Sequence, residues 1–251
     1  MKKVLIIGAS SGYGQALVEE YIEQSWIVFG VARSSYVSDN IHTQYEVSDF
    51  CNLPLYRNDI KNILQKENDI DLVIFVAGNV ILKDKSEHVE QDILDMYANN
   101  LGYIRVTIEL LELLGMNPDV ISFGSQWSYK VGEEYLYWYS IMKHALKYFM
   151  KQQEKLRTCY HFYIPTTSTP KAQKIVEEIS KSKENSGIVF KKDVTAKSVS
   201  KKVYKAYISG NSDSACLLGD LESSEEEDDE FDSILRSLNN FGYSDIINLI
   251  K

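Results

Sequence analysis

The chain has 251 residues, of which 44% are hydrophobic and 25% charged, enough apolar material for one globular α/β domain. A net charge of −9 at pH 7 argues against nucleic acid or an anionic membrane as the main partner. The three cysteines and four histidines show neither a disulfide framework nor a metal-ligand spacing, so we expect no metal and a reducing cytoplasm. No apolar stretch has the length of a membrane span.

A glycine-rich turn follows the first predicted strand. Residues 4–7 are an apolar, mostly β-branched run, and an amphipathic helical pattern that ends near Glu23 follows the turn. The glycines of the turn are Gly8, Gly12 and Gly14. Such glycines let the backbone approach a pyrophosphate, and the first N–H groups and the dipole of the helix favour the anion. An ordinary connection capped by Ser10 or Ser11 is the alternative, but a buried strand before the turn and a helix after it favour a dinucleotide site.

The second predicted strand, residues 27–32, ends without a carboxylate and is followed by Arg33. In a nucleotide-binding fold this position faces the adenosine ribose, where an acidic residue binds a free 2′-hydroxyl and an arginine accommodates a 2′-phosphate. An exposed surface arginine is the alternative interpretation. Given a dinucleotide site, the missing acid and the arginine favour NADPH over NADH.

Strands and helices alternate along the chain as far as Pro165. The further strands are predicted over residues 44–47, 71–76, 120–123 and 160–164. The further helices are predicted over residues 53–64, 87–96, 99–114 and 139–156. Buried strands that alternate with helices are typical of a Rossmann-like, doubly wound parallel sheet.

The pattern loosens after Pro165. Helices are predicted over residues 171–180, 196–208, 231–238 and 243–250, with a short strand over 215–218. The acidic run 222–232 is interpreted as a solvated loop. We expect a single domain, divided into a cofactor-binding and catalytic core (1–165), a substrate lid (166–192) and a C-terminal part (193–251).

Tyr139 and Lys143 lie four residues apart and therefore one turn apart on one face of a predicted helix. That helix begins just after the fifth strand, at the carboxyl edge where open α/β sheets bind ligands. An ammonium near a phenol favours the phenolate, so we expect Lys143 to lower the pKa of Tyr139 and make it a usable proton donor near neutral pH.

These motifs resemble those of the classical short-chain dehydrogenases/reductases from Lys2 to about Thr169. The glycine motif appears as Gly8-Ala9-Ser10-Ser11-Gly12-Tyr13-Gly14, and the Tyr-x-x-x-Lys motif as Tyr139-Ser140-Ile141-Met142-Lys143. The resemblance implies that Tyr139 gives its proton to a substrate carbonyl while hydride arrives from a nicotinamide.

The resemblance also implies two supporting catalytic residues. Ser125 would hydrogen-bond the carbonyl oxygen and stabilise its developing charge, with Ser122 and Ser128 as alternatives. Asn100 would support Lys143 through water, with Asn99 as its alternative. Lys143 would in addition hold the nicotinamide ribose.

The resemblance further implies which residues bind the dinucleotide. They are Gly8, Ser10, Ser11, Gly12, Tyr13, Gly14, Arg33, Ser34, Glu46, Val47, Ala77, Gly78, Tyr139, Lys143, Pro165 and Thr169. The chain departs from the family pattern after the fourth strand, where Asn-Asn-Ala-Gly becomes Phe75-Val76-Ala77-Gly78. The adenine-facing aspartate is matched by Glu46, with Asp49 as a substitute.

Aromatic and basic residues border the expected substrate position. The rings are those of Trp127, Tyr129, Tyr135, Tyr137 and Trp138, and the lid lysines are Lys171, Lys174, Lys181 and Lys183. The rings would stack on a ring or sugar, or else pack on the core or another subunit. The lysines would meet an anionic substrate, or else form a solvated helix face.

The sequence thus predicts a cytoplasmic NADPH-dependent carbonyl reductase, or alcohol dehydrogenase in the reverse direction. Its substrate would be a small carbonyl or alcohol compound, sugar derivatives included, and it would form a homodimer or homotetramer without nucleic acid or membrane. One alternative is a sugar-nucleotide-modifying reductase or epimerase that uses the same tyrosine. Another is a non-catalytic dinucleotide-binding sensor, which the altered motif after the fourth strand would suit.

Overall fold

The computed structural model describes residues 1–33, 41–83, 87–125, 136–164, 173, 177 and 195–210. In these ranges six strands form one sheet. They are β1 (Lys3–Ile7), β2 (Ile27–Ala32), β3 (Thr43–Glu46), β4 (Leu72–Phe75), β5 (Asp119–Ser125) and β6 (Cys159–Ile164). The strand order is β3-β2-β1-β4-β5-β6, and every neighbouring pair is parallel. The predicted Rossmann-like, doubly wound parallel sheet is confirmed.

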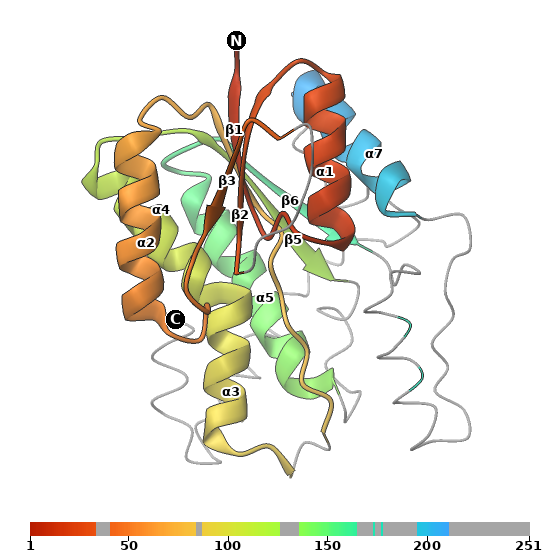
Figure 1. Ribbon diagram of the computed structural model, residues 1–251. Coiled ribbons are helices and arrows are strands. Elements are labelled where there is room, and N and C mark those ends of the chain that lie inside the picture. Colours follow the sequence, from red (N-terminus) through yellow and green to blue (C-terminus); the bar gives the residue numbers. More distant parts are fainter. Residues whose placement is uncertain are drawn as a thin grey trace.

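Helices cover both faces of the sheet. They are α1 (Gly12–Glu23), α2 (Leu53–Lys66), α3 (Glu90–Tyr97), α4 (Tyr103–Leu113), α5 (Tyr137–Gln153) and α7 (Ala196–Ser209), with a π-helical turn, η2 (Ala98–Gly102), between α3 and α4. Helices α1 and α7 pack on one face, and α2, α4 and α5 pack on the other, so the described part has three layers (Figure 1).

The position of β1 inside the sheet, with helices on both faces, explains why its sequence is apolar at successive positions. Leu5 and Ile7 belong to the core under α2, α4 and α5, whereas Val4 and Ile6 belong to the core under α1 and α7. All four side chains are buried. Successive side chains of a strand point to opposite faces, so a strand that is covered on both faces needs an apolar residue at every position.

The main difference from the sequence prediction lies in the segment predicted as one helix over residues 99–114. Its beginning is the π-helical turn η2, and α4 starts only at Tyr103. The other described elements begin and end within a few residues of their predicted bounds. Apart from Gln173 and Glu177, the elements predicted over 171–180, 215–218, 231–238 and 243–250 lie outside the described residues, as does the acidic run 222–232.

The strand order predicts a ligand crevice between β1 and β4. From β1 the chain winds outward to β2 and β3, and then returns to build β4, β5 and β6 on the other side. At such a reversal the connections leave in opposite directions, which opens a ligand crevice at the carboxyl ends of the strands. Among the described residues, no helix is both long and apolar enough to cross a membrane.

Candidate active site

The turn after β1 needs glycine at two positions because of close backbone contacts. Gly8 has a φ of 100°, and a Cβ atom there would lie 2.5 Å from the backbone nitrogen of Ala77. A Cβ atom on Gly14 would lie 1.9 Å from the carbonyl oxygen of Gly8. The predicted glycine motif therefore packs the start of α1 directly onto the end of β1, beside the loop after β4.

The start of α1 leaves space beside Gly12 in the part of the chain that the structure describes. A Cβ atom on Gly12, the first residue of the helix, would meet no atom within 4 Å. Ser11 occupies the N-cap position but makes no side-chain capping hydrogen bond, and Ser10 is half-buried. Space at the start of a helix suits a bound pyrophosphate, because the helix dipole favours negative charge there.

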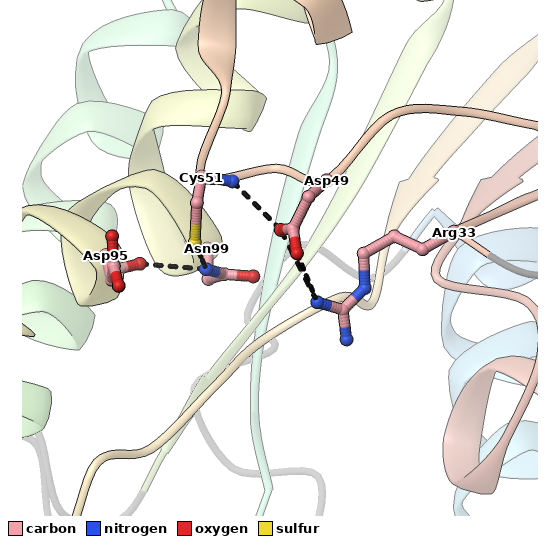
Figure 2. Close-up of polar contacts among 5 residues, drawn as sticks. All are labelled: Arg33, Asp49, Cys51, Asp95 and Asn99. Atoms are coloured by element: carbon pink, nitrogen blue, oxygen red, sulfur yellow. Dashed lines mark hydrogen bonds and ion pairs between the residues drawn. The ribbon is translucent and has the colours of Figure 1, made fainter.

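Arg33 follows β2 and pairs with Asp49, which follows β3 (Figure 2). The Arg33 Nη1 atom lies 3.3 Å from Asp49 Oδ2, and the guanidinium lies 5.9 Å from the centroid of the Phe50 ring. Both charged side chains are more than half exposed, at 54% and 55%. Arg33 is thus exposed directly after β2, with a carboxylate beside it, and its role toward a 2′-phosphate stays a prediction.

Asp49 is an ionised acceptor in a turn. The backbone N–H of Cys51 and the guanidinium of Arg33 lower the pKa of Asp49. Glu46 is the exposed last residue of β3, and the backbone N–H of the buried Val47 donates to the carbonyl of Ala32. Because Arg33 and Cys51 occupy the Asp49 carboxylate, Glu46 is the less engaged of the two candidate adenine acceptors.

Ser125, Tyr139 and Lys143 come together at the carboxyl end of β5. Ser125 ends that strand, and its hydroxyl shares a hydrogen bond with the Tyr139 hydroxyl in the first turn of α5. Lys143 is buried one turn later, where its Nζ donates to the carbonyl of Phe123 at 3.1 Å and lies 5.8 Å from the centroid of the Tyr139 ring.

The pKa of Tyr139 differs from the sequence-based expectation. Burial raises it, and the hydrogen bond from Ser125 lowers it by a smaller amount, so the net change is upward. The prediction that the Lys143 ammonium lowers this pKa is wrong for this structure. The physical reason is that burial removes more hydration from the phenolate than the hydrogen bond with Ser125 restores.

Asn100, rather than Asn99, lies beside the lysine. Its Nδ2 atom donates to the carbonyls of Asn79 at 2.7 Å and Met96 at 2.9 Å, and its Oδ1 atom is buried without a hydrogen-bond partner. A Cβ atom on Gly78 would lie 3.2 Å from that oxygen and 3.7 Å from Lys143 Nζ. The amide oxygen and the ammonium therefore border the same small space.

The side chain of Asn99 contacts other residues than that of Asn100. Its Nδ2 atom donates to the Sγ atom of Cys51 and to the carbonyl of Asp95, both at 2.9 Å (Figure 2). A π turn inserts one residue into a helix and is often found at functional sites. Here it directs two successive asparagines to different surroundings.

The two serines of β5 also have different partners. The Ser122 hydroxyl hydrogen-bonds His161 Nδ1 at 2.7 Å, so Ser122 joins β5 to β6. Ser125, by contrast, contacts Tyr139. Ser128 lies outside the described residues, as do the predicted cofactor residues Ser34, Pro165 and Thr169.

Little of the predicted aromatic substrate wall falls within the described residues. Trp138 is buried in the core beneath α5, and the Tyr137 ring packs edge-on against it. Trp138 is therefore a core residue, as the alternative interpretation has it. Trp127, Tyr129, Tyr135 and the four lid lysines lie outside the described residues.

Some contacts at the site had no signal in the sequence. The hydroxyl of Tyr103 donates to the carbonyl of Ala77 at 2.9 Å, and the Asn79 carbonyl holds Asn100. Each joins residues more than 20 positions apart. An alignment of relatives that paired an aromatic residue in α4 with the loop after β4 would have revealed the first.

Comparison with known proteins gives a family match that covers most of the described residues. A family model described as "short chain dehydrogenase" matches residues 2–158. No curated protein is significantly similar in sequence.

Solved structures share the fold at low sequence identity. A short-chain dehydrogenase family protein from Francisella tularensis is 17% identical, with a TM-score of 0.67 over 81% of this chain and 90% of that one. Actinorhodin polyketide ketoreductase with NADPH is 18% identical, with a TM-score of 0.69 over 85% and 93%. Ligand-free aldohexose dehydrogenase from Thermoplasma acidophilum is 16% identical, with a TM-score of 0.66 over 89% and 97%.

Proposed function

This chain belongs to the short-chain dehydrogenase family of NAD(P)-dependent oxidoreductases, and from that premise we propose that it is an NADPH-dependent carbonyl reductase. In the reverse direction it would be an alcohol dehydrogenase. The observation that carries the proposal is the hydrogen bond between Ser125 and Tyr139 at the end of β5, one helical turn before the buried Lys143.

The residues present fit a dinucleotide. Gly8 and Gly14 let the start of α1 pack closely on the end of β1, and a pyrophosphate would take the space beside Gly12, where the helix dipole suits its charge. Arg33 would hold a 2′-phosphate, and the NADPH in the structurally similar ketoreductase supports this choice. The partnerless Oδ1 atom of Asn100 suits a water that bridges to Lys143.

When bound, the nicotinamide supplies the hydride. Tyr139 donates its hydroxyl proton to the carbonyl oxygen of the substrate, and burial keeps that proton in place at neutral pH. Ser125 donates a hydrogen bond to the same oxygen and stabilises the negative charge that develops there. Lys143 keeps a positive charge beside the Tyr139 ring, held in place by the Phe123 carbonyl.

The cofactor preference tests the proposal most directly. NADPH and NADH are titrated against the wild type and against Arg33→Ala, with intrinsic fluorescence or calorimetry as the readout. Arg57→Ala is the matched control, because Arg57 on α2 pairs with Glu109 of α4 instead of facing the crevice edge. It removes the same charge and one surface ion pair.

We expect the wild type to bind NADPH at least tenfold more tightly than NADH, a difference of about 1.4 kcal/mol. Arg33→Ala removes the partner of the 2′-phosphate, so the preference collapses in that variant, whereas Arg57→Ala retains it. Binding without preference would leave an oxidoreductase that uses both cofactors. Binding of neither nucleotide to the wild type would contradict the proposal.

Turnover separates the reductase from a non-catalytic sensor. The wild type would oxidise NADPH with at least one member of a panel of ketones, aldehydes and keto-sugars. Tyr139→Phe would still bind NADPH, through the other residues of the site, but would lose the proton donor and with it activity on every substrate. If the wild type bound NADPH yet reduced no carbonyl compound, the sensor would be the better description.

The proposed enzyme is a single domain that forms an oligomer. We treat the chain as one domain in which residues 166–192 serve as the substrate lid and 193–251 complete the fold, and we expect a homodimer or homotetramer. A small-molecule substrate is what the family implies. A reducing cytoplasm is the location that we propose for the enzyme.

A further inference from the structure

Tyr103 is the first residue of α4, and its phenol is buried beneath the loop that follows β4. The ring is fully excluded from solvent. Its hydroxyl donates a hydrogen bond of 2.9 Å to the carbonyl of Ala77. A buried hydroxyl usually has a partner, and here that partner is the backbone of the loop at the cofactor crevice.

Ala77 is held from both sides. Its N–H donates to the carbonyl of Ile7 at 3.1 Å, and its backbone nitrogen lies where a Cβ atom on Gly8 would be only 2.5 Å away. The hydrogen bond from Tyr103 fixes the opposite end of the same residue. A shift of Ala77 would therefore change the turn that is proposed to hold the pyrophosphate.

Gly78 extends the effect toward the catalytic groups. A Cβ atom there would lie 3.2 Å from Asn100 Oδ1 and 3.7 Å from Lys143 Nζ. The two-residue segment Ala77–Gly78 thus contacts both halves of the site. The preceding residues, Phe75 and Val76, have no polar side chain with which to fix the segment.

The ring of Tyr103 belongs to a rigid aromatic cluster. Its centroid lies 4.9 Å from that of Phe50, 6.1 Å from that of Tyr56 and 5.9 Å from that of Phe75. Phe50 also lies under the Arg33 guanidinium. The same packed rings therefore support the loop after β4 and the arginine at the adenosine end of the crevice.

We propose that Tyr103 is a positioning residue for the dinucleotide. Its hydroxyl fixes the Ala77 carbonyl and so holds Ala77–Gly78 against the Gly8 turn, in a chain that has Phe75 and Val76 where the family pattern has two asparagines. The inference rests on the proposed dinucleotide site. Tyr103, a buried residue of α4, would act on the dinucleotide through Ala77 and not by direct contact.

The test compares Tyr103→Phe with Tyr56→Phe. Both remove one hydroxyl from a fully buried ring of the same cluster, but the Tyr56 hydroxyl bonds Thr107 Oγ1 at 2.8 Å, away from the loop. NADPH is titrated against both variants and the wild type. We expect about five- to tenfold weaker binding in Tyr103→Phe and less than a twofold change in Tyr56→Phe.

Backbone amide hydrogen exchange gives a second readout that needs no cofactor. In Tyr103→Phe the amides of Ala77, Gly78 and Asn79 would exchange faster, whereas in Tyr56→Phe they would exchange as in the wild type. Equal effects of the two variants on both readouts would mean that the cluster acts only through packing, and would overturn the inference. Absence of NADPH binding to the wild type would overturn the proposed function instead, and unchanged exchange in Tyr103→Phe would overturn the anchor itself.

Discussion

The environment of Tyr139 decides when this residue is a proton donor. Burial disfavours the phenolate, and the hydrogen bond from Ser125 favours it. Because burial is the larger effect, the phenol stays protonated at neutral pH. That suits reduction, in which the proton must be available when the carbonyl oxygen acquires charge.

Removal of the Ser125 hydroxyl should raise the pKa of Tyr139 further. In Ser125→Ala the interaction that favours the phenolate is lost while burial remains, so the phenol titrates at higher pH than in the wild type. The measurement is the ultraviolet absorbance of the phenolate against pH, taken as the difference from the same protein carrying Tyr139→Phe.

Ser122→Ala is the matched control for this titration. It removes a hydroxyl from the same strand, but one that bonds His161, so the titration of Tyr139 should follow the wild type. A lower pKa in Ser125→Ala, or an equal rise in both variants, would contradict the assignment of Ser125 as the partner of Tyr139.

At the scale of elements, the strands β1, β2 and β4 were predictable from sequence because their burial is nearly uniform. The runs in β1, β2 and β4 are apolar at almost every position, and only a strand covered on both faces requires that. The glycine turn was predictable for a similar reason, since Gly8 and Gly14 are fixed by backbone contacts that hold for any side chains nearby.

The π-helical turn could not be predicted in this way. A π-helical turn of five residues is too short to be told from an α-helix by its sequence pattern, although its inserted residue changes the directions of the side chains. For the same reason the sequence left two candidates for the supporting asparagine. Only the placement of Gly78 and Lys143 distinguishes them.

The anchor from Tyr103 to Ala77 was likewise beyond the sequence. It depends on how α4 lies over the loop after β4. The sequence pattern around Tyr103 does not distinguish it from the other buried tyrosines of the chain. The sequence did indicate that something was unusual there, since Phe75 and Val76 depart from the family pattern. Local patterns identify elements, whereas contacts between distant elements need the assembled fold.

The glycine at the start of α1 offers a clean test of the phosphate site. Gly12→Ala introduces a side chain at a φ of 54°, which costs about 1–2 kcal/mol in stability, and directs a methyl group into open space at the helix N-terminus. If the pyrophosphate occupies that space, NADPH binding should weaken by at least tenfold. The measurement is NADPH titration together with urea unfolding.

Gly115→Ala is its matched control. Gly115 has a φ of 68°, and a Cβ atom there would likewise meet nothing within 4 Å, but the residue follows the end of α4, away from the carboxyl edge of the sheet. The two variants should lose similar stability, and only Gly12→Ala should lose affinity. Equal affinity in both would contradict a phosphate site at this helix start.

For the whole molecule, the polar groups buried between β5, β6 and α5 link the catalytic edge to global stability. His161 lies in β6 with Nδ1 bonded to Ser122 and with Nε2 buried and unpartnered. Burial and the nearby ammonium groups of Lys143 and Lys147 lower the pKa of His161 to about 3. The ring is therefore neutral in the folded protein throughout the physiological range.

This neutral histidine should make the protein sensitive to acid. The unfolded chain binds a proton at this position below a pH of about 6.5, whereas the folded chain does so only near pH 3, so unfolding takes up a proton between those values. Stability from this group is complete above pH 6.5 and is lost as the pH falls, by at most about 1.4 kcal/mol for each pH unit.

His161→Asn should remove that dependence, because an amide can still bond Ser122 but does not titrate. We expect the free energy of unfolding in urea to fall less steeply for this variant than for the wild type between pH 6.5 and 4.5, by about 2–3 kcal/mol in total. The comparison uses the slope of the free energy of unfolding against pH. A loss of packing that lowers this free energy equally at pH 6.5 and at pH 4.5 therefore has no effect. His88, whose pKa burial also lowers, contributes to both proteins alike. Parallel curves would contradict this prediction, because they would mean that His161 takes up its proton as readily in the folded chain as in the unfolded chain.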